Sequence, residues 1–216
     1  MKTIKGIWRF SRVICYTFVC LFQAYTRFKR VDRKEKGRML RYYPTQVLKL
    51  AGVRCSYEGN VPELLHECGL TDTPPAYMVL SNHISWLDIF SLDSQLPSRF
   101  IAKAEIAKWP VFGLIAQQIG TLFINRSSKR AILRINDDIR GALCNCEAVT
   151  IFAEGTTTFG NELLPIKANF IAPACEIGAT VQPVILSYKN KGKPTKRAAF
   201  AGDVTLFGSL WNVVTM

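Results

Sequence analysis

The stretch that decides the fold is Tyr77–Ser94, YMVLSNHISWLDIFSLDS. Its first five residues, YMVLS, form a short apolar run of the kind found in buried β-strands. Its last part, Trp86–Ser94, has the apolar spacing of a short helix. Between them lie Asn82 and His83, at the end of the predicted strand, where α/β proteins gather functional side chains. This order predicts an α/β domain with a functional site close to residue 83.

The same alternation of strand-like and helix-like segments continues to the end of the chain. It favours an α/β fold with a mixed, largely parallel central sheet flanked by helices. Pro183 implies that its strand lies at an edge of the sheet or begins there. The predicted strands are Tyr77–Ser81, Arg99–Ala102, Thr121–Ile124, Val149–Phe152, Val181–Leu186 and Ala198–Ala201. The predicted helices are Trp86–Ser94, Pro110–Gln118, Lys129–Cys146 and Ile171–Ile177.

The surplus positive charge is confined to the first quarter of the chain. Residues 1–54 account for the whole net charge of +12, and the rest of the chain sums to zero. Such a basic block favours a polyanionic partner, either nucleic acid or an anionic membrane surface. An apolar stripe at helical spacing favours the membrane. The stripe consists of Ile7, Phe10, Ile14, Phe18, Leu21, Tyr25 and Phe28.

The uncharged run within this segment, residues 13–26, is short for a helix that spans a bilayer, which needs about 20 residues. We therefore expect an amphipathic anchor that lies in the membrane interface or dips into it, with a single spanning helix and a cleaved signal peptide as alternatives. Bulky Phe22 opposes cleavage after Ala24, and the basic run from Arg27 favours the cytoplasmic face, as of a bacterial inner membrane.

The seven cysteines are odd in number and scattered, which favours reduced thiols in a cytosol-facing protein. Cys144 and Cys146 form a lone C-x-C without a histidine close by, so no metal site is expected.

Candidate chemistry begins at His83, in the sequence N-H-I-S-W-L-D. The other histidine, His66, lies in a polar connector, and we assign it no role. Residues five apart on one straight helix point about 140° apart, so His83 and Asp88 meet only if His83 precedes a helix that begins near Ser85. An aspartate on one ring nitrogen would fix the tautomer and make the other nitrogen a better base. A capping or buried histidine unrelated to Asp88 explains the local sequence equally well.

Two further motifs follow predicted strands. Residues 120–126, GTLFINR, deliver Arg126, whose planar charge can hold a phosphate or a carboxylate. Residues 152–158, FAEGTTT, offer the Glu154 carboxylate and several hydroxyls at a turn. Taken singly, the first motif is explained by an ordinary surface arginine. The second is explained by a turn at the end of a strand, in which Gly155 supplies an unusual backbone conformation.

Taken together and in this order, the motifs between residues 77 and 188 resemble the glycerolipid acyltransferase family, which includes the lysophosphatidate (1-acylglycerol-3-phosphate) acyltransferases. The resemblance implies that His83 and Asp88 are the family's H-x4-D pair, the catalytic base and the acid that orients it. It also implies substrate binding by Gly120, Arg126, Glu154, Gly155 and Thr156.

The implied reaction moves a fatty acyl group from acyl-CoA or an acyl carrier protein to the free hydroxyl of a lysolipid, without cofactor, metal or nucleic acid. Residues 55–216 would be the catalytic domain, shortened at its C-terminus, and residues 1–54 the membrane-associated segment. Lysophosphatidate, giving phosphatidate in phospholipid biosynthesis, is the expected acceptor, and a lyso-ornithine lipid is the alternative. Ala153 replaces the family's proline, and Thr157 replaces a second arginine in a sequence, E-G-T-T, that resembles lyso-ornithine lipid acyltransferases.

Two other functions fit parts of the chain. A serine hydrolase could use Ser85, but no G-x-S-x-G surrounds it. A non-catalytic membrane protein could bind lipid, or nucleic acid, through the basic segment alone, although no nucleic-acid-binding module is visible.

Overall fold

The computed structural model describes residues 2–59, 76–125 and 129–216. At its centre is a five-stranded sheet in which every pairing is parallel, with the strand order β3-β2-β4-β1-β5. The strands are β1 Tyr77–Ser81, β2 Arg99–Lys103, β3 Leu122–Ile124, β4 Val149–Phe152 and β5 Thr180–Val184. The sheet is thus less mixed than predicted. Among the described residues, antiparallel pairing is confined to the hairpin of β6 (Lys189–Asn190) and β7 (Lys193–Pro194).

Five of the six predicted strands are present, and β5 lies at an edge of the sheet, as Pro183 indicated. The sixth prediction, Ala198–Ala201, is wrong, because this segment is a turn and an irregular connection. Ala198 and Ala199 are both buried, and Ala198 packs against residues of the surrounding helices. The amide of Phe200 bonds to the carbonyl of Ile84 and not to a strand. Apolar composition here reflects burial in a packed connection.

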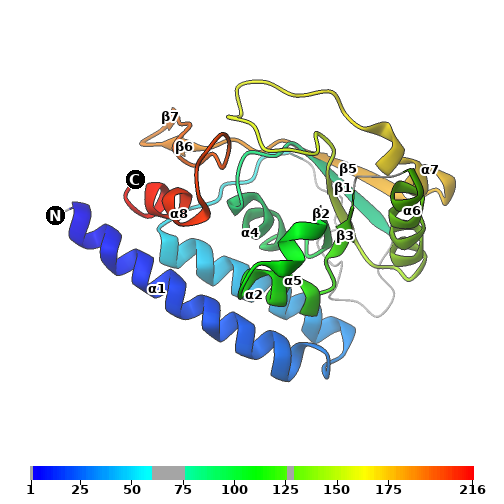
Figure 1. The fold of residues 1–216 in the computed structure, drawn as a ribbon, viewed down its shortest axis with the longest axis horizontal. Helices are drawn as coiled ribbons and strands as arrows, with labels where there is room; N and C mark the ends of the chain where they lie inside the picture. Colours follow the sequence, from blue (N-terminus) through cyan, green and yellow to red (C-terminus); the bar gives the residue numbers. More distant parts are fainter. Residues whose placement is uncertain (1, 60–75, 126–128) are drawn as a thin grey trace.

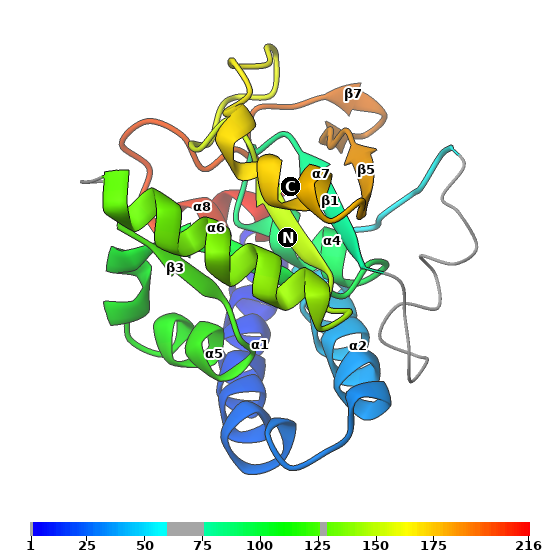
Figure 2. The ribbon, with the colours of Figure 1, turned by 90° about the vertical axis from the view of Figure 1, so that its right-hand side faces the viewer.

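One face of the sheet is covered by α6 (Lys129–Cys144) and the short α7 (Ala172–Glu176), which follows the 3-10 turn Ala168–Phe170 (Figure 2). Ile135, Ile139 and Leu143 of α6 pack with Met78, Val149 and Ile151 of the sheet in one buried cluster. These three residues lie at helical spacing and form the core face of α6.

The other face of the sheet rests on α4 (Leu87–Asp93), so that side chains along β1 alternate between two cores. Tyr77 and Val79 join the α4 side, and Met78 joins the α6 side. The 3-10 helix η2 (Ala104–Lys108) and α5 (Phe112–Gln118) connect β2 to β3.

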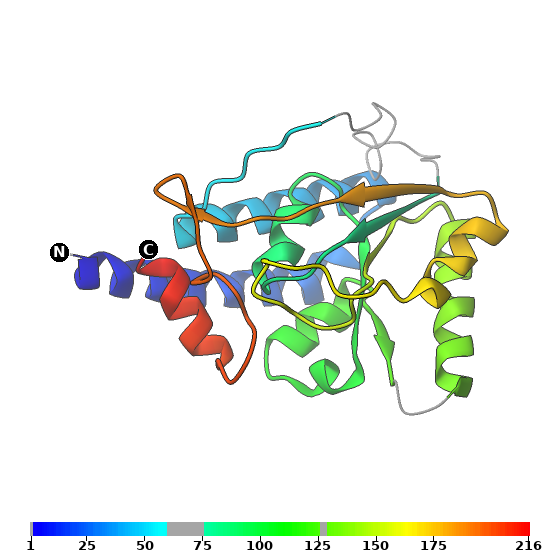
Figure 3. The ribbon, with the colours of Figure 1, turned by 90° about the horizontal axis from the view of Figure 1, so that it is seen from above.

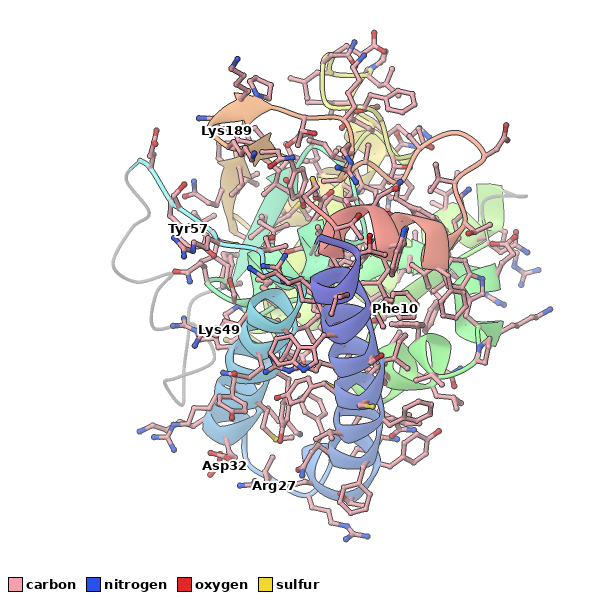
Figure 4. All side chains as sticks on the ribbon, turned by 90° about the vertical axis from the view of Figure 1, so that its left-hand side faces the viewer. Phe10, Arg27, Asp32, Lys49, Tyr57 and Lys189 are labelled. Carbon is pink, nitrogen blue, oxygen red and sulfur yellow. The ribbon has the colours of Figure 1, made fainter. Side chains whose placement is uncertain are left out.

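A third layer consists of α1 (Lys2–Gln23), the π-helical turn η1 (Ala24–Phe28), α2 (Arg33–Ala51) and α8 (Leu206–Val214). This layer lies on the side of the sheet away from α6 (Figure 1, Figure 3). Helices α1 and α2 run side by side, with Arg27 and Asp32 at the end where they join (Figure 4).

Residues 1–54 share a hydrophobic core with the rest of the molecule. Buried Val13 of α1 and Val47 of α2 pack with Leu87 of α4 and Val213 of α8. At the start of α2, Asp32 accepts a hydrogen bond from the Glu35 amide at 2.8 Å, which caps the helix. The N-terminal segment is therefore packed onto the α/β domain along much of its length.

Helix α1 has a second, outer face that is apolar and exposed. At helical spacing its members point away from buried Val13 and Thr17. The predicted stripe thus divides between the two faces, because Phe28 is buried while Phe18 is 56% exposed. Within the described ranges, no helix combines the length and the apolarity needed to cross a bilayer. The outer face comprises Ile4, Ile7, Trp8, Phe18, Val19 and Phe22 of α1, followed by Tyr25 of η1.

Candidate active site

The candidate site lies where two neighbouring parallel strands end. His83 follows β1 and Glu154 follows β4, and the register pairs Ser81 with Phe152 at the carboxyl ends of these strands. Loops at this end of a parallel sheet commonly form ligand sites. The fold therefore brings together two motifs that are 71 residues apart in the sequence.

His83 and Asp88 form the predicted pair. Nδ1 of His83 lies 2.8 Å from Oδ2 of Asp88, with the histidine in the loop before α4 and the aspartate in the first turn of that helix. The side chain of Asp88 is fully buried, whereas that of His83 is 20% exposed. The loop geometry required for the two side chains to meet is thus present.

Asp88 is held by donors from several directions. Its Oδ2 also accepts the amides of Ile84 at 2.6 Å and Ser85 at 2.9 Å, and its Oδ1 accepts the hydroxyl of Tyr188 at 2.5 Å. The hydroxyl of Ser85 accepts the amide of Leu87, so the S-x-x-D sequence forms a reciprocal cap similar to a capping box. These donors replace the water that burial removes from the carboxylate.

Tyr188 is a member of the site that the sequence analysis missed. Burial, reinforced by the negative charge of Asp88, raises the pKa of the Tyr188 phenol well above its ordinary value. The phenol therefore stays protonated and donates to Asp88. Its separation of 100 residues from Asp88 left no local signal in the sequence.

The backbone and the ring of His83 are both fixed. Its amide donates to Oε1 of Glu154 at 2.8 Å, and its carbonyl accepts the amide of Thr158 at 2.8 Å. Its ring stacks on Phe152, with centroids 3.9 Å apart and planes 10° apart. None of the described residues forms a hydrogen bond with Nε2, which leaves that nitrogen for a substrate.

Glu154 braces the loops around His83. It is 4% exposed, and its second oxygen, Oε2, accepts the amide of Leu164 at 2.9 Å. Both carboxylate oxygens thus hold backbone groups. Substrate binding by Glu154 stays a prediction.

The other predicted substrate-binding residues are placed differently. Gly155 has φ of +75°, a left-handed conformation that favours glycine, and exposed Thr156 follows it in the same loop. Gly120 precedes β3 and therefore lies at the amino-terminal end of the sheet, away from His83. Arg126 and His66 lie outside the described residues.

Ser85 and the cysteines offer little support for other chemistry. Ser85 is 0% exposed, so its hydroxyl is not accessible to a substrate as a serine nucleophile must be. Within the part of the chain that the structure describes, every cysteine is a free thiol. In that same part, no three histidine, cysteine, aspartate or glutamate residues are grouped to hold a metal ion.

Known proteins resemble this chain over the same region. Residues 55–187 match the model of the family described as Acyltransferase. The 1-acyl-sn-glycerol-3-phosphate acyltransferase of Neisseria gonorrhoeae is 44% identical over 144 residues, which cover 66% of this chain and 56% of that protein. The lyso-ornithine lipid O-acyltransferase of Pseudomonas aeruginosa is 41% identical over 131 residues, which cover 61% of this chain and 50% of that protein. The chain thus spans about half the length of these relatives.

A solved structure shares the fold. The crystal structure of the 1-acyl-sn-glycerophosphate (LPA) acyltransferase PlsC from Thermotoga maritima superposes with a TM-score of 0.60, covering 100% of this chain and 95% of that one. The two are 18% identical, so this likeness concerns the fold alone.

Proposed function

This chain belongs to the acyltransferase family, and we propose that it transfers a fatty acyl group from a thioester to the free hydroxyl of a lysolipid. The observation that carries the proposal is the His83–Asp88 pair, with its 2.8 Å contact at Nδ1 and its open Nε2. A buried carboxylate that orients an imidazole creates a positioned general base.

In the proposed reaction, Nε2 of His83 accepts the proton of the lysolipid hydroxyl as the oxygen attacks the thioester carbonyl of acyl-CoA or an acyl carrier protein. Asp88 stabilises the imidazolium that forms. The tetrahedral intermediate then collapses: the carbon–sulfur bond breaks, the new ester remains, and the proton on His83 passes to the departing thiolate. The acyl group is never attached to the enzyme.

We propose lysophosphatidate as the acceptor, with Arg126 as its main phosphate ligand, and a lyso-ornithine lipid as the alternative. Relatives with both names share similar identity with this chain, 44% and 41%. Thr157 stands where many members of the family carry a second arginine. Its hydroxyl donates to the carbonyl of Phe200 at 2.5 Å, so it is engaged within the protein.

The acceptor is tested by comparing kcat/KM for lysophosphatidate and a lyso-ornithine lipid in the wild type, Thr157→Arg and Thr157→Gln. Both replacements lose the bond to Phe200, so the difference between them isolates the added charge. If phosphate is the native group, the arginine improves lysophosphatidate use relative to glutamine. A wild-type preference for the lyso-ornithine lipid, reduced by the arginine, would overturn the proposal of lysophosphatidate as the acceptor and leave the His83 chemistry in place.

Arg126→Lys tests the proposed phosphate ligand. This substitution is expected to raise KM for the acceptor more than KM for the donor.

We also propose that the outer face of α1 binds a membrane surface. Trp8 and Phe22 on this face are 59% and 63% exposed, and Arg12 lies over the Trp8 ring at 4.0 Å from its centroid. Phe207 and Trp211 of α8 are also exposed, and their rings lie against Phe10 of α1. An apolar face flanked by cations is typical of helices that lie in the membrane interface.

Deleting residues 1–54 cannot test this proposal cleanly, because Val13 and Val47 belong to the shared core. Phe22→Asp can be compared with Leu133→Asp on α6, since the two native side chains are 63% and 65% exposed. Sedimentation with phosphatidylglycerol vesicles is expected to show weaker binding for Phe22→Asp only, and high salt should weaken binding of the wild type. Equal binding by both variants would contradict a membrane role for this face.

A further inference from the structure

A cavity of about 400 Å³ opens between α2 and the amino-terminal ends of the parallel strands. Its volume is in the range of about 300–1,000 Å³ that is common for small-molecule sites. Tyr77, the first residue of β1, lines it, whereas His83 follows the last residue of that strand. The rise of β1 alone separates the two places by about 13 Å. The cavity is therefore distinct from the candidate active site.

The lining of the cavity is strongly basic. It contains Lys29, Arg33, Lys36 and Arg99, but a single acid, Glu147. Glu147 is already paired, because its Oε2 lies 2.8 Å from Nη1 of Arg99. Among the residues that the structure describes, no carboxylate forms an ion pair with Lys29, Arg33 or Lys36. Three positively charged residues on the α2 side thus line the cavity without an anionic partner from the part of the chain that the structure describes.

The remaining lining is largely apolar. Phe28 is 8% exposed and lies beside the cations, with Nζ of Lys36 5.9 Å from its ring centroid. Leu40 and Ile119 add further apolar surface. A bare inorganic anion would leave these walls uncovered, and an uncharged lipid would leave the cations unpaired. The surface is complementary to an anion that carries an apolar chain.

We infer that this cavity binds the phosphate headgroup of an anionic phospholipid, with the beginning of an acyl chain against Phe28, Leu40 and Ile119. The Arg33 guanidinium, which donates one bond to the carbonyl of Asn145, has further N–H groups in the planar arrangement that suits phosphate. Lys29 and Lys36 add point charges. This is a second lipid site, remote from acyl transfer, and it does not depend on the acceptor proposed above.

The cysteines allow occupancy to be measured locally. Cys146 is partly exposed and lines the cavity, whereas exposed Cys144 and Cys175 are absent from its lining. The rate of N-ethylmaleimide modification at each thiol can be followed by peptide mass spectrometry on the intact chain. Dihexanoyl phosphatidate is expected to slow modification of Cys146 and to leave Cys144 and Cys175 unchanged. Dihexanoyl phosphatidylcholine and inorganic phosphate are expected to protect less.

Paired variants test the role of the cations. Arg33→Gln combined with Lys36→Gln should raise the phosphatidate concentration for half-protection by about tenfold or more, because two charge-assisted contacts are lost. The control is Lys34→Gln combined with Lys49→Gln, which removes two positive charges from the same helix at residues that do not line the cavity. This control pair should leave the protection of Cys146 unchanged. Lys29→Gln, on an exposed side chain, should act in the same direction as the first pair but less strongly.

Three results would overturn the inference. The site is refuted if phosphatidate fails to protect Cys146, and the role of the cations is refuted if both double variants are protected alike. Protection by inorganic phosphate equal to that by phosphatidate would refute the lipid assignment. The readout involves no acyl transfer, so each of these results would leave the proposed function standing.

Discussion

The two ends of α4 place two buried carboxyl groups in different surroundings. Asp88 in the first turn and Asp93 in the last are 0% and 2% exposed. Asp88 accepts four hydrogen bonds, from His83, Ile84, Ser85 and Tyr188. Asp93 accepts the amide of Ser98 at 3.0 Å. The two residues are equally deep but differ in the donors around them.

This difference shows that hydrogen-bond donors, more than depth, determine what a buried carboxyl group does. Burial raises the pKa of Asp93 well above its ordinary value, and the Ser98 amide lowers it only in part. At Asp88 the donors replace lost hydration on both oxygens and leave the carboxylate directed at His83. One end of the helix therefore supplies a fixed partner for a base, and the other supplies a structural contact.

The largest expected effect comes from removing the partner of Asp88. His83→Ala should lower acyl transfer by about 10²–10⁴-fold, the usual loss when a general base is removed. Circular dichroism should show an intact fold, because the side chain is partly exposed. Transfer from a thioester to lysophosphatidate, measured at saturating donor, checks this. Wild-type turnover in the variant would show that His83 is not the base.

A matched pair of substitutions then compares the two carboxyl groups directly. Asp88→Asn should lower kcat by about 10²-fold or more, because an amide favours the wrong histidine tautomer and leaves the imidazolium without its counter-charge. Asp93→Asn should leave kcat unchanged. Steady-state kinetics of both variants tests the comparison, and similar losses in the two would mean that α4 acts only through its packing.

Tyr188→Phe is expected to have a smaller effect, because Asp88 keeps three donors. Loss of one hydrogen bond to a charged group corresponds to about a tenfold decrease in kcat. Steady-state kinetics of Tyr188→Phe and the wild type at saturating donor checks this prediction. An unchanged kcat in the variant would show that the Tyr188 hydroxyl does not support Asp88 and contributes to packing alone.

The smallest effect concerns stability and belongs to Asp93. A carboxyl group whose pKa is raised on folding contributes most to the free energy of unfolding when the pH is below its pKa in the unfolded chain, here close to 3.8. This contribution is lost as the pH rises through its pKa in the folded protein. Asp93→Asn keeps an acceptor for Ser98 and has no charge to bury. Its free energy of unfolding in urea should therefore exceed that of the wild type by a margin that grows from acidic to alkaline pH. A margin independent of pH would show that Asp93 is not shifted upward.

The sequence was informative wherever one element carries its own pattern. Val149–Phe152 was predicted with its observed bounds, because a short apolar run between polar segments has few other outcomes in a buried sheet. The pattern misled at Ala198–Ala201, where small apolar side chains line a buried connection. Helix α8, Leu206–Val214, was not predicted.

The pairing of His83 with Asp88 was determined by the sequence itself, because a loop followed by an S-x-x-D cap returns the aspartate to the histidine over a few residues. The contacts of Tyr188 and Glu154 were decided only by the tertiary structure. Each depends on which strands become neighbours and where their loops end, and spacing along the chain does not encode that order. The basic cavity has the same origin, since α2 reaches the amino-terminal strand ends only through packing of the whole molecule.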